Sequence, residues 1–283
     1  EISACLVGSE MCIRDRLKIA SIGSSSSGNA YIVSDGKTRL LLDVGLTAKR
    51  IKEGLAECML SAEDIQGVFV THEHTDHVKS IRAIAKACIY AKVYTSRGTI
   101  YNCDKFEYVK PEQITRIAAQ DMVRIGDICI KAFSLSHDAS EPVGFSFIED
   151  GEQLSVATDT GIVTDEIAEE LTRADAIVFE ANHEESILQM GDYPYSLKQR
   201  ILGEYGHLSN VTSGIALTRG LLARKESGLV SSEQRIMLAH LSTHNNTPDT
   251  ALLTVKNILH ENNLRQGNDF TLKVADKDKL TTM

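Results

Sequence analysis

Residues 72–77 read HEHTDH and place three histidines and one aspartate in six positions, shortly after the apolar run VFV. Neutral imidazole and carboxylate groups are ligands that Zn²⁺, Mn²⁺ and Fe²⁺ accept in proteins. His72 and His74 alternate in an extended turn, whereas Asp76 and His77 begin a helical segment and face a second point. The competing interpretation is a polar loop that binds nothing. Four ligand-type side chains are more than one ion takes from one loop, so the spacing favours two ions that share a site.

A site for two ions needs further ligands, including one that bridges the ions. His137, Asp159 and His240 each follow an apolar, strand-like run in a separate segment. Because strand ends meet along one edge of a sheet, these residues are candidates for the same site. The structural alternatives are a surface histidine and an aspartate that merely starts a turn. His240 competes with His244, and we prefer His240 because it directly follows the buried run IMLA.

The order of these residues, H-x-H-x-D-H followed by a distant His, an Asp and a last His, resembles the metallo-β-lactamase superfamily from about Leu17 to the C-terminus. The resemblance implies an α/β fold, a four-layer αββα sandwich with two metal ions at one edge of its sheets. It also implies the ligands: His72, His74 and His137 for one ion, and Asp76, His77 and His240 for the other, with Asp159 as the bridge.

Within the superfamily, the segments SIGSSSSGNAYIV, EANHE, GHLSN and AHLSTHNNTP resemble the WalJ (YycJ) group most. This resemblance implies DNA ends as the substrate and exonuclease action in the 5′-to-3′ direction. Glu180 and His207 match in part the segments that such phosphodiesterases carry near the leaving group. Asp43 matches the buried acidic residue that family members place beneath the metals, where it orients ligands by hydrogen bonding.

The predicted function is therefore hydrolysis of a phosphodiester by a hydroxide that bridges two divalent ions, Zn²⁺, Mn²⁺ or Fe²⁺. Asp76 would bind one ion and orient the nucleophile, and His183 or His207 would protonate the departing sugar oxygen or position the phosphate. For both histidines a polar strand end or a helix cap is the alternative. The Ser-rich residues 24–27 would bring backbone N–H groups to a phosphate, or form only a flexible turn. The residues expected to orient ligands or phosphate are Asp43, Asn29 and Glu180.

Two other functions use the same residues. A thioesterase, a lactonase or a cyclic-nucleotide phosphodiesterase would keep the same metal ligands, and a non-catalytic binding module would use the metals for stability. Seven side chains for two ions leave the coordination open, which favours catalysis. The segment between Asp159 and His240 is too short for the inserted nuclease domain of RNA-processing relatives, and no long protruding arm is expected. The short segment and the lack of an expected arm both argue against a function in tRNA maturation.

The composition, with 42% hydrophobic residues and a net charge of −9, fits an α/β protein and argues against a broad basic surface. Binding of DNA would need a local basic rim, for which Arg97 and Lys198 are candidates. No apolar run approaches the roughly 20 residues that span a bilayer. The six cysteines contain no CxxC pair, and Cys88 and Cys129 lie in apolar runs, so a reduced cytoplasmic protein is expected.

The elements that must position these side chains are strands and helices in alternation. Asp35-Gly36 and Asp150-Gly151 predict hairpins, and apolar residues from Ile81 to Ile89 at helical spacing predict a helix. Thr247-Pro248 predicts a helix start. We predict a single domain over residues 17–283. Residues 1–16 resemble a translated sequencing-adapter remnant and are predicted to be a non-native extension.

Overall fold

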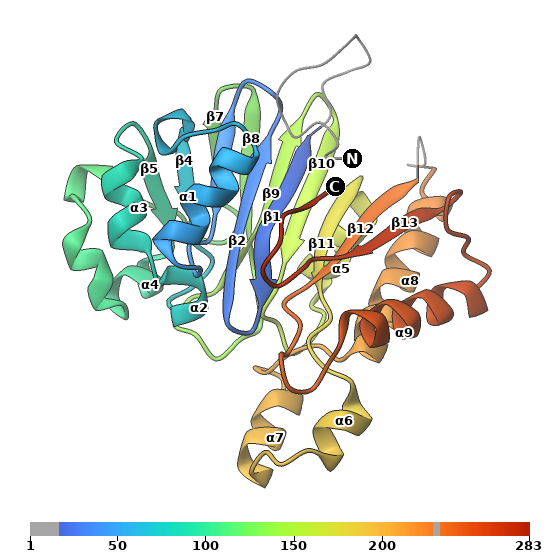
Figure 1. Ribbon diagram of the computed structural model, residues 1–283. Coiled ribbons are helices and arrows are strands. Elements are labelled where there is room, and N and C mark those ends of the chain that lie inside the picture. Colours follow the sequence, from blue (N-terminus) through green and yellow to red (C-terminus); the bar gives the residue numbers. More distant parts are fainter. Residues whose placement is uncertain (1–16, 229–232) are drawn as a thin grey trace.

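The computed structural model describes residues 17–228 and 233–283. The prediction about residues 1–16 therefore falls outside the described residues, and the single-domain boundary stays a prediction. The described residues form two β-sheets packed face to face, with helices on both outer faces (Figure 1). This arrangement confirms the predicted αββα fold class.

The first sheet is antiparallel from β14 to β3 and parallel from β3 to β6. In spatial order its strands are β14 (Thr281–Thr282), β1 (Lys18–Ser25), β2 (Gly28–Ser34), β3 (Arg39–Leu42), β4 (Gly67–Phe69), β5 (Lys92–Thr95) and β6 (Ile114–Arg116). The helices of this half are α1 (Ala48–Glu57), α2 (Thr75–Val78), α3 (Ile81–Ala87) and α4 (Arg97–Tyr101), with 3-10 turns at Ala62–Asp64, Asp104–Tyr108 and Pro111–Gln113.

The second sheet is parallel from β13 to β10 and antiparallel from β10 to β7. In spatial order its strands are β13 (Phe270–Val274), β12 (Gln234–Ala239), β11 (Ala176–Glu180), β10 (Glu152–Ala157), β9 (Val143–Glu149), β8 (Ile128–Ser134) and β7 (Met122–Ile125). The helices that cover it are α5 (Asp165–Arg173), α8 (Asn210–Glu226) and α9 (Pro248–Glu261). Two further helices, α6 (Glu185–Met190) and α7 (Tyr195–Leu202), project from one end of the sandwich (Figure 1).

Alternation of apolar residues along the strands produces the layers. One set of buried side chains, including Tyr31, Phe69, Phe145 and Phe147, fills the space between the sheets. The residues between them on the same strands face the helices instead, as Ile32 does in the cluster that contains residues of α1 and α3. Burial of these faces is the main stabilising contribution to such a fold.

Most local predictions agree with the structure. Both Asp-Gly hairpins are present, and Thr247 caps α9 by accepting a hydrogen bond from the backbone N–H of Thr250. The prediction for α3 was too long, because the helix ends at Ala87 and Ile89 is 57% exposed. The α6–α7 projection had no counterpart in the sequence-based prediction. In the described residues no helix is both long and apolar enough to span a membrane.

Strand direction explains why the candidate residues meet. β10, β11 and β12 run parallel, so Asp159, Glu180 and His240 come at or just after strand ends that share one edge of the second sheet. β3 and β4 are likewise parallel and carry Asp43 and the loop with His72 past the corresponding edge of the first sheet. Packing of the two sheets brings the edges together.

Candidate metal centre

Three of the converging residues leave their strands in an unusual backbone conformation. Asp43, Asp159 and His240 have φ angles of 56°, 62° and 57°. Residues other than glycine adopt this left-handed region at a cost, and such residues concentrate at functional sites. The turn at each position lets the chain leave the sheet while the side chain stays at the edge.

The seven predicted ligands lie in two groups. In each group one ligand atom per residue lies within 4.8 Å of the others: His72, His74 and His137 form the first group, and Asp76, His77, Asp159 and His240 the second. In the first group Nε2 of His137 lies 3.2 Å from Nδ1 of His74. In the second, Nε2 of His240 lies 3.3 Å from Oδ2 of Asp76. The structure thus brings all seven side chains together, and their role as ligands stays a prediction.

The carboxylate of Asp159 lies between the two groups. Its Oδ2 is 3.2 Å from Nε2 of His77, and its Oδ1 is 3.3 Å from Nε2 of His240. The same Oδ1 is 3.7 Å from Nε2 of His137 in the first group. One carboxylate oxygen therefore reaches toward ligands of both groups, which is the position that a bridging ligand needs.

Hydrogen bonds on the outer side orient four of the imidazole rings. Nδ1 of His77 lies 2.7 Å from Oδ2 of Asp43, and Nδ1 of His240 lies 2.9 Å from Oε1 of Glu180. Nδ1 of His137 donates to the carbonyl oxygen of Gly206 at 3.1 Å, and Nδ1 of His72 is 3.0 Å from Oγ1 of Thr71. In each ring Nε2 is left for the site. Such outer partners fix the tautomer and the direction of metal-binding histidines.

The buried charges of the centre favour a cation. Burial alone would lower the pKa of His77, but the carboxylates of Asp159 and Asp43 outweigh it and raise this pKa well above its usual value. Against the same effect of burial, Asp159 and Asp76 raise the pKa of His240 to about 10. Burial would raise the pKa of Asp159, yet His240 and His77 hold it well below its usual value. Positive charge is thus drawn into the centre.

The donor set fits divalent metal ions. Nε2 of His72 is buried and makes no hydrogen bond to the described residues. A buried polar atom without a partner is costly in a folded protein. His72 belongs to the first group described above, and imidazole with carboxylate is a ligand set that Zn²⁺, Mn²⁺ and Fe²⁺ accept. The residues present therefore fit two such ions.

Glu180 and His207 extend the centre toward solvent. Nδ1 of His207 lies 2.8 Å from Oε1 of Glu180, the oxygen that also holds His240. Burial would raise the pKa of Glu180, but His207 and His240 lower it to about 2, so the group is a carboxylate at neutral pH. The side chain of His207 is 20% exposed, which leaves it open to a substrate.

The structure shows which of the remaining candidate residues lie in the centre and which do not. Among the described residues, His183 makes no side-chain hydrogen bond and belongs to neither group, and burial lowers its pKa to about 4. His244 is exposed and bonds Thr243, so the geometry favours His240 over it. Nδ2 of Asn29 lies 3.2 Å from Nε2 of His77, inside the centre.

The loop at residues 24–27 does not offer a cradle of free backbone N–H groups. The amides of Ser24 and Ser26 donate to the carbonyl oxygens of Asp276 and Leu241, and the amide of Ser27 donates to Oγ of Ser25. These three amides are therefore engaged within the chain.

The two residues predicted for a basic rim contact other parts of the chain. Lys198 donates to two carbonyl oxygens of the chain, and the guanidinium of Arg97 lies over the ring of Tyr101 with 5.2 Å to its centroid. Lys198 therefore acts within the projection rather than as a free cation.

Two residues beside the ligands were not predicted. Thr71 donates its backbone N–H to Asp43 at 2.9 Å, which fixes the carboxylate under His77. Oδ1 of Asp138 lies 3.4 Å from Nε2 of His137. Each directly adjoins a predicted ligand in sequence, so adjacency was the only available signal.

Comparison with known proteins gives consistent matches. A sequence model of a protein family, described as a beta-lactamase superfamily domain, matches residues 38–217 of this chain. The chain is 34% identical over 269 residues to exodeoxyribonuclease WalJ of Streptococcus pneumoniae, covering 94% of this chain and 97% of that protein. It is 32% identical over 263 residues to exodeoxyribonuclease YycJ of Bacillus anthracis, covering 92% of this chain and 96% of that protein. The structure of YhfI of Bacillus subtilis, a metallo-beta-lactamase fold protein, superposes with a TM-score of 0.66 at 17% sequence identity. The match covers 95% of this chain and 100% of that protein.

Proposed function

We propose that this chain, which belongs to the metallo-β-lactamase superfamily and is a metal-dependent hydrolase, is an exonuclease that degrades DNA in the 5′-to-3′ direction. Two relatives named exodeoxyribonucleases, at 34% and 32% identity over nearly their whole length, support the substrate. The observation that carries the two-ion mechanism is the position of the Asp159 carboxylate between two ligand groups, because it supports a pair of ions over a single one.

The ligand assignment follows the two groups. His72, His74 and His137 would hold one ion, and Asp76, His77 and His240 the other, with Asp159 shared. When bound, two divalent ions lower the pKa of the water between them, which makes hydroxide available at neutral pH, and they neutralise the charge that develops on the phosphate. The choice between Zn²⁺, Mn²⁺ and Fe²⁺, and the cytoplasmic location, stay predictions.

His207 is the group that we assign to the departing sugar oxygen. It is partly exposed at the centre, and Glu180 accepts a hydrogen bond from its Nδ1, so its Nε2 is directed away from that carboxylate. A histidine held in this way can donate a proton to the leaving oxygen in the transition state. Asp76, with its side chain 23% exposed, orients the nucleophile from the other side. Buried His183 lacks comparable access.

The test measures Mn²⁺-dependent degradation of duplex DNA labelled at its 5′ ends. We expect His74→Ala and Asp76→Ala to lose activity by about 100-fold or more, because each removes a ligand or a nucleophile contact. His244→Ala is the matched control, since His244 lies outside both ligand groups. Full activity in the first two variants would discard the mechanism. Cleavage of thioesters, lactones or cyclic nucleotides without any attack on DNA would favour a small-molecule hydrolase instead.

A further inference from the structure

A cavity of about 290 Å³ opens beside His207. One wall comes from the sheet edge and is polar, with Asn182, Ser242 and His207 among its residues. The opposite wall comes from α7 and its flanking loops and is largely aromatic and aliphatic, apart from Arg200, which pairs with Asp138 in the same lining. The cavity therefore has a polar side near the candidate metal centre and an apolar side away from it.

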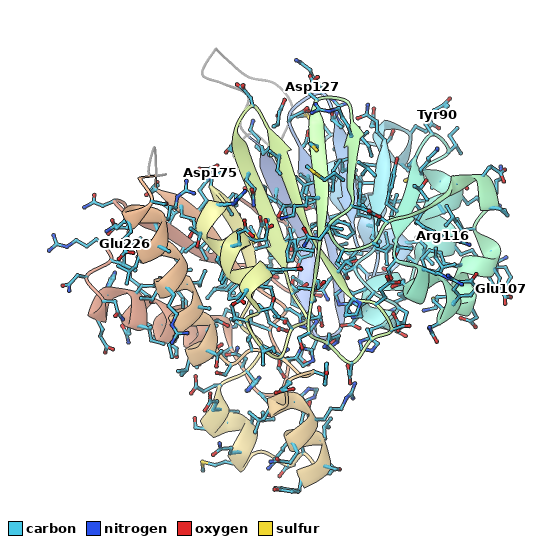
Figure 2. All side chains as sticks on the ribbon, turned by 180° about the vertical axis from the view of Figure 1, so that it is seen from behind. Tyr90, Glu107, Arg116, Asp127, Asp175 and Glu226 are labelled. Atoms are coloured by element: carbon cyan, nitrogen blue, oxygen red, sulfur yellow. The ribbon has the colours of Figure 1, made fainter. Side chains whose placement is uncertain are left out.

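The fold covers the apolar wall only in part, because Leu197 and Ile201 are half-buried. None of the described residues of α7 is fully buried, and the helix projects away from the sheets in both views (Figures 1 and 2). Leu197 and Ile201, four positions apart, share one face of the helix and line the cavity. A helix normally packs such a face against the core, but here the face borders the cavity.

Polar contacts fasten this projection. Nζ of Lys198 donates to the carbonyl oxygens of Gln189 and Gly191 at 2.7 and 2.6 Å, which ties α7 to the end of α6. Arg200 donates through Nε to Oδ2 of Asp138, the neighbour of His137 in sequence.

A second tie follows α7. The carbonyl oxygen of Gly206 accepts the hydrogen bond from Nδ1 of His137. The apolar wall is thus anchored on both sides of Tyr205 to the loop that carries a predicted metal ligand.

The shape and chemistry of the cavity match one nucleotide. Its volume of about 290 Å³ lies just below the usual range of ligand sites, about 300–1,000 Å³, so it is too small for a base pair with its backbone. The polar wall suits a sugar and phosphate beside the centre. The ring of Tyr205, whose residue is 61% exposed, and that of Tyr193 can take the face of a base.

From these observations we infer that the α6–α7 projection forms a pocket for the terminal nucleotide of a DNA strand and stacks its unpaired base on Tyr205. This inference rests on the proposed function and adds the state of the substrate: the last base pair must open before its nucleotide enters. An end with a terminal mismatch or a short 5′ overhang is then a better substrate than a fully paired blunt end.

The experiment compares Tyr205→Ala, Tyr205→Phe and Tyr195→Ala. Tyr195 is the matched control, because it lies on α7 with 77% exposure but does not line the cavity. Steady-state kinetics are measured on three DNA duplexes that differ only at the 5′ end: blunt, terminally mismatched and overhanging. Metal content and melting temperature show whether the variants are folded. We expect them to fold, because both tyrosines are exposed.

We expect Tyr205→Ala to raise KM for the mismatched and overhanging duplexes by about tenfold, the loss of one base–aromatic stack, with a smaller change in kcat. Tyr205→Phe should keep the wild-type KM and Tyr195→Ala should match the wild type. The inference is overturned if the wild type digests DNA and Tyr205→Ala behaves like Tyr195→Ala on all three duplexes. A wild type that digests no DNA refutes the proposed function, and the inference with it.

Discussion

His207 and His240 share a single carboxylate oxygen, Oε1 of Glu180, at 2.8 and 2.9 Å from their Nδ1 atoms. His240 points its other nitrogen into the candidate metal centre, whereas His207 is partly exposed to solvent. The ring that would bind a metal and the ring that would meet the leaving group are therefore oriented by the same buried anion.

Glu180→Gln should disturb both functions at once. The amide is neutral, so it holds each Nδ1–H less strongly and orients both rings less firmly. We expect metal affinity to fall by about 10–100-fold, the usual cost of losing such an outer partner, and DNA degradation to fall with it. Calorimetric titration with Mn²⁺ measures the affinity. Glu169→Gln, which alters an exposed ion pair with Arg173, is the control. Wild-type affinity in Glu180→Gln would contradict this role.

Asp43→Asn tests the support beneath His77. Asp43 accepts the Nδ1 hydrogen bond of His77 at 2.7 Å and is fully buried. We expect the variant to bind metal about 10–100-fold more weakly. The control is Glu170→Gln, because Glu170 is also buried and accepts hydrogen bonds from Lys131 and Ser146 but touches no histidine and belongs to no candidate metal group among the described residues.

Both variants should lower the melting temperature, since each weakens a buried hydrogen-bonded anion. Only Asp43→Asn should change the metal affinity. Equal metal affinities in the two variants would show that Asp43 serves the fold alone.

Metal removal should destabilise the protein. A ligand that binds only the folded state at 100 times its Kd stabilises that state by about 2.7 kcal/mol, so excess Mn²⁺ or Zn²⁺ should raise the melting temperature and EDTA should lower it. His72→Ala removes the buried Nε2 that has no partner among the described residues, and it should reduce the metal-dependent increase. His244→Ala should retain the increase. A metal response in His72→Ala equal to that of wild type would remove His72 from the ligand set.

Metal binding should release protons near neutral pH. The pKa of His77 is raised well above its usual value and that of His240 to about 10, so both rings are protonated in the metal-free protein at pH 7.5. Each must lose a proton to bind a metal, and the apparent metal affinity should therefore rise with pH up to about 10. Calorimetry in buffers with different ionisation enthalpies measures the release. Heats that are independent of the buffer would contradict the protonated state.

The same shifts set a pH dependence for the metal-free protein. A folded-state pKa above the unfolded value, about 6.5 for histidine, means that protonation favours the folded state. The contribution of His77 and His240 to stability is complete below about pH 6.5 and is lost as the pH rises through their raised values. Thermal melts in EDTA between pH 6.5 and 10 should show this decline, and saturating metal should reduce it.

The amino-acid sequence by itself determined the motif, the strand ends and the fold class. The spacing in residues 72–77 is local, and alternation of apolar residues marks strands whatever they pair with. Parallel strands then place Asp159 and His240 on a common edge, and the family match confirms the predicted superfamily.

Only the tertiary structure decided how these side chains meet. The sequence treats His183 and His207 alike, but folding leaves the first buried without a side-chain partner among the described residues and places the second on Glu180. Likewise, no local sequence pattern predicts that the apolar face of α7 lines a cavity instead of packing against the core. The physical reason is that ring orientation and burial depend on contacts between segments far apart in the chain, whereas periodicity and spacing record only the near neighbours of each residue.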